Sequence, residues 1–294
     1  MPFSYTAEEG FIDRSSVDRR SGHDRRHDSK GLKGLIERRN HRRRKENRGG
    51  PTEVFKFREI TSLTDLFWSF RTRYEVYRSV GFIPENGDGL DIDCYDPRSV
   101  HLGAYVVEDD EERMIGTIRH VTWAPSPVQD LVRQLSGQCK EESLRRLQDT
   151  PEPLPLLESF DLPEYRQAME RVSDGEQDHA PRPFEVSRLT VLPRHWHKGI
   201  TRGIHELVTL WCHSTDYLHR DAVIATNPNN ARKYHTMGFS PIPGTDQIVY
   251  KGLNQPAVAM EFDLQQAYAS HPYYGPCSTV ADFFLENGFF LARH

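Results

Sequence analysis

Apolar residues recur along the chain with two spacings, that of a β-strand and that of an α-helix, and both patterns begin after the first 50 residues. Bulky apolar positions over 55–60 indicate a first strand. Helical spacing of apolar residues follows over 63–77, and two strands are expected over 101–107 and 114–123 on either side of an acidic turn. This part of the chain therefore predicts strands packed against a helix.

The segment 125–183 interrupts this pattern with two predicted helices and a proline-rich stretch. After it, strands are expected over 184–192, 221–226, 247–251 and 257–263, with helices over 204–218 and before Gly238. Mixed strands and helices with one insertion predict an α/β (α+β) fold. We expect a single mixed, mostly antiparallel central sheet, flanked by helices, in one domain over 51–294.

The first 50 residues differ in composition and predict a basic, disordered arm. Residues 13–48 carry 14 Lys and Arg against 6 Asp and Glu, a net charge of +8, whereas 49–294 carry 24 against 35, a net charge of −11. The arm has too few apolar residues to bury a core, and it ends at the turn signal Gly49-Gly50-Pro51. It is either a solvated tail or a handle for an acidic partner, such as a carrier protein, nucleic acid or an anionic lipid surface.

Composition excludes several classes of protein. Hydrophobic residues make up 36% of the chain, and no run approaches the roughly 20 apolar residues that a bilayer helix needs. The N-terminal residues show no basic and apolar pattern typical of a secretory signal. The four cysteines are far apart in the sequence, so we expect free thiols and a cytoplasmic location.

The most specific motif lies over 184–239. A strand leads into a loop with Gly199, an amphipathic helix and a second strand; Asn227, Tyr234 and the pair Gly238-Phe239 follow. This block resembles the Gcn5-related N-acyltransferase (GNAT) superfamily. The resemblance implies an acyl-CoA N-acyltransferase-like fold that binds a phosphopantetheine thioester between those two strands.

The loop around Gly199 departs from the pattern of that superfamily, because Trp196 and Thr201 replace its usual basic and small residues. Backbone N–H groups at the start of a helix bind phosphate, and glycine permits close approach. A loop with one glycine fits the single phosphodiester of a carrier-bound pantetheine better than the diphosphate of coenzyme A; alternatively, Gly199 only ends a turn. The residues predicted to bind the donor are Leu189, Val191, Lys198, Gly199, Ile200, Thr201 and Asn227.

A second set of residues resembles the acyl-homoserine-lactone synthases, which belong to the same superfamily and take acyl groups from acyl carrier protein. The long-chain N-acyl amino acid synthases and the exosortase-associated acyltransferases combine both sets. The positions that match are Arg73, Asp93, Asp96, Arg119, Glu185 and Arg188. The resemblance implies that Arg73, Asp93, Asp96 and Ser187 bind substrate.

The residue types agree with acyl transfer to an amine. An α-amine has a pKa near 8, so its attack on a thioester needs a base, orientation and donors to the developing oxyanion. Glu185 is the predicted base, Tyr234 the predicted proton donor to the leaving thiolate, and backbone N–H groups over 189–191 the oxyanion donors. Arg119 and Arg188 are predicted to form a fork for an acceptor carboxylate.

Structural alternatives exist for each of these residues. Glu185 and Arg188, or Asp93 and Asp96 with Arg73, are also consistent with ion pairs, and Tyr234 with packing under Phe239. His195 and His197 favour a surface loop over a metal site, and no metal is expected. The C-terminal phenylalanines, Phe283, Phe284, Phe289 and Phe290, favour core packing.

We therefore expect an N-acyltransferase that moves a fatty acyl group from acyl carrier protein or acyl-CoA, as cosubstrate, to an amino acid or similar amine. No tightly bound cofactor is expected. The insertion is a candidate lid over an acyl tunnel, with Leu131, Leu135, Leu144 and Leu147 on one side. Two alternatives remain: a CoA-dependent acetyltransferase on a protein or small amine, and a non-catalytic module that binds nucleic acid, lipid or a carrier protein through the arm.

Overall fold

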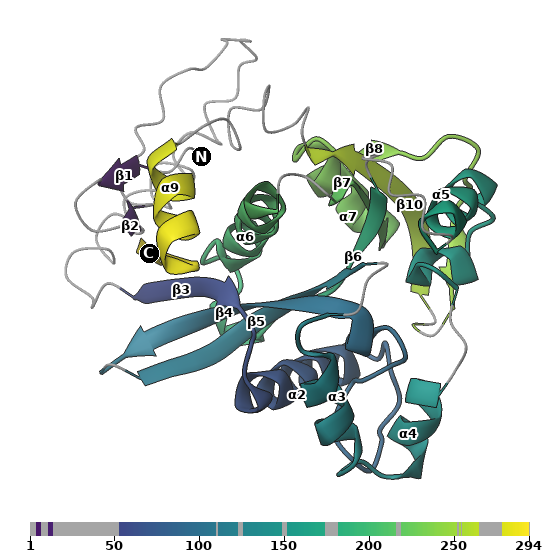
Figure 1. Ribbon diagram of the computed structural model, residues 1–294, viewed down its shortest axis with the longest axis horizontal. Coiled ribbons are helices and arrows are strands. Elements are labelled where there is room, and N and C mark those ends of the chain that lie inside the picture. Colours follow the sequence, from purple (N-terminus) through teal and green to yellow (C-terminus); the bar gives the residue numbers. More distant parts are fainter. Residues whose placement is uncertain are drawn as a thin grey trace, which may run out of the picture.

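Figure 1 shows the computed structural model, in which a strongly twisted open sheet has helices on both faces. The structure describes residues 4–6, 11–13, 53–109, 111–122, 126–148, 152–173, 182–215, 219–251, 253, 255–264 and 278–293. Residues 14–50, most of the predicted basic arm over 1–50, lie outside the described residues, whereas Ser4–Thr6 and Phe11–Asp13 of that arm form strands that the prediction of disorder did not expect.

The strands follow the order β1-β2-β11-β3-β4-β5-β6-β7-β10-β8, and β9 pairs with β10. Most neighbours are antiparallel; β6 with β7 and β2 with β11 are parallel. The strands are β1 (Ser4–Thr6), β2 (Phe11–Asp13), β3 (Val54–Glu59), β4 (Ser99–Glu108), β5 (Glu111–Val121), β6 (Arg182–Val191), β7 (His219–Thr226), β8 (Ser240–Pro241), β9 (Ile248–Tyr250), β10 (Gln255–Asp263) and β11 (Phe289–Arg293). The predicted mixed, mostly antiparallel sheet is confirmed.

The helices lie on the two sides of this sheet, with α2 and α3 on one face and α6 and α9 on the other (Figure 1). They are α2 (Leu63–Ser79), α3 (Gln129–Ser136), α4 (Glu141–Gln148), α5 (Pro163–Ser173), α6 (Ile200–Ser214), α7 (Pro228–His235) and α9 (Ser278–Asn287). The helix α2 begins where predicted, because the Ser62 side chain caps it by accepting from the Asp65 N–H. Within the described part of the chain, no helix combines the length and apolar character needed to cross a membrane.

The main core lies between the sheet and α6. Gly203 of α6 sits against Phe57 of β3, and a Cβ at Gly203 would come within 2.3 Å of that ring. The helix can therefore pack closely on the sheet only with glycine there. Phe284 and Phe290 are buried in the same core, which confirms core packing for these C-terminal phenylalanines.

The insertion divides into two parts with different packing. Val132 and Leu135 of α3 are buried in a cluster with Phe70 of α2, and Leu131 and Leu147 pack partly against the same cluster. None of the four leucines that were predicted to face an acyl tunnel lines the central cavity described below. The later residues 152–158 do reach that cavity, so they are the part of the insertion that covers it.

The strands β6 and β7 separate along their length. Their parallel pairing runs from Arg182 opposite His219 to Glu185 opposite Val223 and then stops. Beyond that point β6 remains paired with β5, and β7 with β10. The divergence opens the sheet at Glu185, and the candidate site lies in this opening (Figure 1).

Candidate active site

A cavity of about 890 Å³ lies between the diverging ends of β6 and β7. Both strands contribute side chains to its wall, and residues 152–158 of the insertion cover part of it. The lining residues from the two strands are Glu185, Val186, Ser187, Arg188, Leu189, Ile224, Ala225 and Thr226. The two strands that the sequence predicts around the acyl donor are therefore the strands that open the cavity.

Glu185 is the last residue of β6 that pairs with β7, and it has no exposed surface. Its Oε2 accepts a hydrogen bond from the Leu156 N–H at 2.6 Å, and its Oε1 accepts from the Tyr250 hydroxyl at 3.5 Å. Burial raises the pKa of Glu185 to about 8, while the Leu156 N–H and the charges of Arg119 and Arg188 act in the opposite direction. The carboxyl therefore changes its charge near the pKa of an α-amine.

This pKa has a consequence for folding stability. Between its ordinary value of 4.5 and about 8, Glu185 ionises in the unfolded chain but stays protonated in the folded protein. The free energy of unfolding should therefore fall as the pH rises through this window, by up to about 1.4 kcal/mol per pH unit from this group, and level off above it. We expect Glu185→Gln to remove this contribution. Urea unfolding of the wild type and of Glu185→Gln from pH 4 to 9 should give free energies of unfolding whose difference changes with pH. A difference that stays constant with pH would show that the pKa of Glu185 is not raised.

Arg73 of α2 is completely buried and holds two carboxylates. Its Nη1 lies 2.7 Å from Asp96 Oδ1, and its Nε lies 3.2 Å from Asp91 Oδ2. Arg146 of α4 binds the other oxygen of Asp91 at 3.0 Å. The ion pair between Arg73 and Asp96 confirms the structural alternative for these residues. Neither residue lines the cavity, so their predicted contact with substrate is replaced by a role inside the protein.

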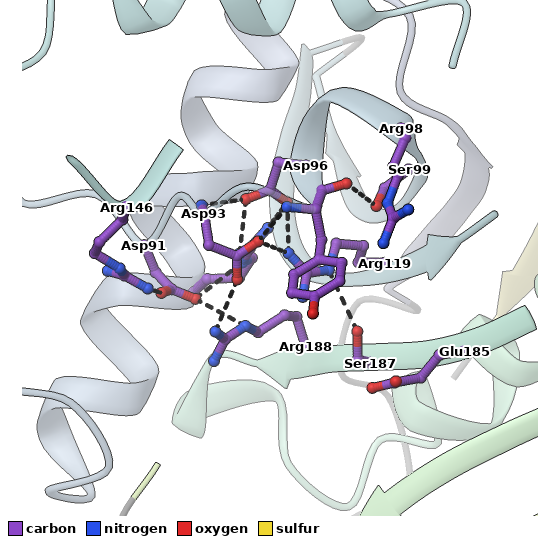
Figure 2. Close-up of polar contacts among 12 residues, drawn as sticks. Asp91, Asp93, Asp96, Arg98, Ser99, Arg119, Arg146, Glu185, Ser187 and Arg188 are labelled. Carbon is purple, nitrogen blue, oxygen red and sulfur yellow. Dashed lines mark hydrogen bonds and ion pairs between the residues drawn. The ribbon is translucent and has the colours of Figure 1, made fainter. Parts of the chain in front are cut away.

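Asp93 forms the cavity side of the same network (Figure 2). Its Oδ1 accepts from Arg119 Nη1 at 2.5 Å, and its Oδ2 accepts from Arg188 Nη2 at 2.9 Å. Burial alone would raise the pKa of Asp93, but the two guanidinium groups outweigh it and hold the pKa well below its ordinary value. The predicted fork of Arg119 and Arg188 thus exists, but Asp93 occupies it in place of a substrate carboxylate.

Arg188 also marks a bulge in β6. Thr190 pairs with Thr117 and Ser187 with Arg119, so that Arg188 and Leu189 lie opposite the single residue Ile118 of β5. Arg188 has a φ of 57°, in the left-handed region. The bulge takes the backbone at 188–189 out of the regular ladder, beside the cavity. It thereby frees backbone groups at one end of the segment for which oxyanion donors are predicted.

Tyr234 lies on α7, which begins at the cap residue Asn227. The ring packs edge-on against Phe239 at 5.4 Å between centroids, and Tyr234 also lines the cavity. Both interpretations of this residue from the sequence therefore hold in part. Burial raises the pKa of Tyr234 above its ordinary value, so the hydroxyl keeps its proton at neutral pH and is a weaker acid than a free tyrosine.

The predicted donor-binding residues fall into two groups. Leu189 and Asn227 line the cavity, whereas Lys198, Ile200 and Thr201 lie beside the start of α6 and Val191 is buried in the core. Gly199 caps α6 with a φ of 75°, a left-handed conformation that glycine adopts readily. Lys198 forms an ion pair with Glu53 at 2.6 Å.

The loop before α6 corrects one expectation. His195, predicted on a surface loop, is 4% exposed and packs edge-on against Phe55. Within the described ranges, no three His, Cys, Asp or Glu side chains are grouped so that they could hold a metal ion. The feature of this loop that remains a candidate for donor binding is the turn at Gly199 before the start of α6.

Two contacts of Glu185 and one further residue of the cavity are absent from the sequence analysis. Leu156 contributes a backbone N–H, Tyr250 of β9 contributes a hydroxyl, and Glu158, in the middle of the insertion, lines the same cavity. A backbone group has no signature in a sequence. Tyr250 belongs to a three-residue strand about 65 residues from Glu185, so no local spacing connects the two.

Comparison with known proteins identifies the fold. Residues 72–168 match the family model of the acetyltransferase (GNAT) domain. Among solved structures, the chain is similar to FeeM, an N-acyl amino acid synthase from uncultured soil microbes, with 15% identity and a TM-score of 0.50 over 76% of this chain and 98% of that chain. At this identity the likeness shows the fold, which confirms the predicted GNAT architecture.

Two acyl-homoserine lactone synthases also align with the chain. BjaI, a CoA-dependent enzyme, shows 15% identity and a TM-score of 0.44 over 79% of this chain and 89% of that chain. LasI shows 16% identity and a TM-score of 0.42 over 76% and 96%. No curated protein sequence matches the chain.

Proposed function

We propose that this chain, which has the GNAT fold and matches the GNAT family model over residues 72–168, is an acyltransferase that moves a fatty acyl group from a phosphopantetheine thioester to the amine of an amino acid or a similar small molecule. The observation that carries this proposal is the position of Glu185, a buried carboxyl with a pKa of about 8, in the wall of a cavity between two diverging strands. Both substrates fit such an opening, with the thioester between the strands.

Each residue has a role in the proposed reaction. Glu185 removes the proton from the attacking amine, since its pKa matches that of the amine. Backbone N–H groups at the bulge around Arg188 and Leu189 stabilise the oxyanion of the tetrahedral intermediate. Tyr234 gives a proton to the leaving thiolate, so amide and free thiol are formed.

The ionic network supports an acceptor that carries a carboxylate. Four guanidinium groups, from Arg73, Arg119, Arg146 and Arg188, surround three carboxylates, which leaves one net positive charge beside the cavity. Asp93 and Ser187 line the cavity next to this charge and are suited to hold the amine. In this arrangement the field of the network, rather than a free fork, attracts the acceptor.

This arrangement predicts that an amino acid is a better acceptor than its amide. We expect kcat/KM to be about 10-fold higher for the acid, which corresponds to about 1.4 kcal/mol, because the amide loses the attraction to the net positive charge. Initial rates with matched acid and amide pairs measure this ratio. Equal values for the two acceptors would contradict the electrostatic role.

Acyl carrier protein is the proposed donor, because the basic arm over 13–48 has a net charge of +8 and acyl carrier proteins are acidic. The cytoplasm is the proposed location, in keeping with cysteines that are free in the described part of the chain.

An alternative, CoA-dependent acetyl transfer, is favoured by the block from Asn227 to Phe239, but a cavity of about 890 Å³ exceeds the needs of an acetyl group. A non-catalytic binding module would not need the buried Glu185.

Neutralising the arm tests the donor. Replacing Arg38, Arg39, Arg42, Arg43 and Arg44 with glutamine keeps the chain length and removes five charges. We expect KM for acyl carrier protein to rise several-fold at low salt, with kcat unchanged, because steering acts on association and is screened by salt. Added salt should reproduce this effect in the wild type. An uncharged acyl-pantetheine thioester is the control substrate and should keep its KM; an unchanged KM for carrier protein would assign the arm to another partner.

The function itself is tested by mass spectrometry of lipids that form when the protein is expressed. N-acyl amino acids that appear with the wild type and disappear with Glu185→Gln would support the synthase. Acetylated products together with co-purified coenzyme A would support the acetyltransferase instead. Nucleic acid that is released only by high salt, without any acyl product, would support the binding module.

A further inference from the structure

The buried position of Glu185 creates a requirement for proton release. In the proposed reaction, an ammonium acceptor and a thioester become an amide and a thiol, and one proton is released for each turnover. Glu185 receives the proton of the amine, yet its exposed fraction is 0%. A carboxyl in this position needs a neighbour through which the proton reaches solvent before the next cycle.

Of the two oxygens of Glu185, only Oε1 faces a group that exchanges protons. Oε2 is bound by the Leu156 N–H, whereas Oε1 lies 3.5 Å from the Tyr250 hydroxyl. This separation is long for a hydrogen bond, as is common for catalytic contacts in structures without substrate. Tyr250 lines the same cavity and ends the short strand β9.

A polar cluster that reaches solvent lines the same cavity as Tyr250. Lys251, the next residue, forms an ion pair with Glu158 Oε2 at 3.1 Å, and Glu158 Oε1 accepts from the Tyr95 hydroxyl at 2.5 Å. The exposed fraction is 23% for the Glu158 side chain and 70% for Lys251. Glu158 therefore joins the inside of the cavity to its surface, and it belongs to the same turn, Pro155–Glu158, as Leu156.

We propose that Tyr250 is the relay through which Glu185 exchanges its proton with Glu158 and solvent. This role rests on the proposed function, in which Glu185 is the base. When Glu185 is protonated, it donates to the Tyr250 oxygen while the Tyr250 proton passes towards Glu158. One O–H bond forms as the other breaks, so the tyrosine ends each cycle neutral.

The charges around Glu185 are compatible with this direction of transfer. Arg119 on β5 and Arg188 on β6 favour the ionised carboxylate, Asp93 disfavours it, and Tyr95 and Tyr250 are the neighbouring hydroxyls. Burial and the nearby carboxylates, Glu185 among them, raise the pKa of Tyr250 well above its ordinary value. Tyr250 therefore passes a proton on without persisting as a phenolate.

Tyr250→Phe tests the relay, with Tyr165→Phe as the matched control. Tyr165 also donates to a glutamate, Glu261, but lies outside the lining of the cavity. We expect Tyr250→Phe to lower kcat about 10-fold near pH 7.5 and to move the rising limb of the pH profile to higher pH, because the ionised base loses a donor. A small buffer base, imidazole, should restore part of the rate. The control should keep the wild-type profile.

Glu158→Gln is a second variant at the other end of the path. It keeps an acceptor for Tyr95 but cannot take up a proton, so we expect a lower kcat with partial rescue by imidazole. The proposal would be overturned if Tyr250→Phe and Glu158→Gln both showed the same pH profile and the same response to imidazole as the control Tyr165→Phe. A lower kcat without any change in the pH limb or rescue would also overturn it and indicate a structural role only.

A separate measurement distinguishes failure of the relay from failure of the proposed function. The pH dependence of unfolding reports the ionisation of Glu185 without any substrate. When Glu185 is present, Tyr250→Phe should shift the pH range over which the free energy of unfolding falls. In a Glu185→Gln background, Tyr250→Phe should leave the pH dependence of unfolding unchanged. If that coupling is present and no acyl transfer is found, the proposed function fails while the contact stands. If transfer is found and the coupling is absent, the relay fails.

Discussion

Replacing Glu185 with glutamine is expected to lower kcat for amide formation by about 10²-fold or more, the usual effect of losing one general base. The substitution keeps the shape of the side chain, and its oxygen still accepts from the Leu156 N–H. It removes the group that takes the proton from the amine. Because the substrates bind in the cavity beside it, KM should change much less than kcat.

The pH profile provides the control for this variant. In the wild type, the rate should rise with pH through about 8 as Glu185 ionises, and this limb should vanish in Glu185→Gln. Glu59 provides a matched substitution, since it is a half-buried glutamate outside the cavity lining whose pKa burial also raises. Glu59→Gln should keep the turnover and the pH limb. Unchanged turnover in folded Glu185→Gln would remove Glu185 from the mechanism.

Loss of Arg73 is expected to lower the free energy of unfolding by about 3–5 kcal/mol, because two buried carboxylates each lose one of their guanidinium partners. Arg73 and its partners Asp91 and Asp96 are all fully buried. Arg73→Met keeps much of the apolar stem and removes the guanidinium. Chemical denaturation at pH 7 measures the change, and a low salt dependence is expected because the site is shielded from ions.

An exposed ion pair is the matched control for Arg73. Arg113 and Glu108 pair at 2.7 Å with more than half of each side chain exposed. Arg113→Met should therefore cost no more than about 1 kcal/mol. If both variants lost the same small amount, the network would not hold the fold together, and its role would be confined to its field in the cavity.

The sequence predicts the elements of this fold well where one period of apolar residues dominates. The helix α2 and the strands β3, β5 and β6 follow the expected positions within a few residues. The strand expected over 247–251 is confirmed as β9, whereas β8 was not expected, because its two residues are too few to form a period. Their positions depend on pairing with β10, a contact between distant segments.

The candidate site is predicted in its residue types more than in its contacts. Glu185, Tyr234, Asp93 and Ser187 do lie together around the cavity. Arg119 and Arg188 show why contacts are harder to predict: a guanidinium binds a carboxylate of the protein as readily as one of a substrate, and only the fold places Asp93 between them.

The hydrogen bond from Leu156 to Glu185 joins two parts of the chain with separate tasks. The insertion covers the cavity, whereas β6 carries the base, yet the N–H that favours the carboxylate comes from the insertion. An exchange of this insertion between related enzymes would therefore carry the pH optimum along with the choice of acyl chain. Variation in substrate range and in optimal pH would be inherited together, because the segment 152–158 both lines the cavity and supplies the Leu156 N–H.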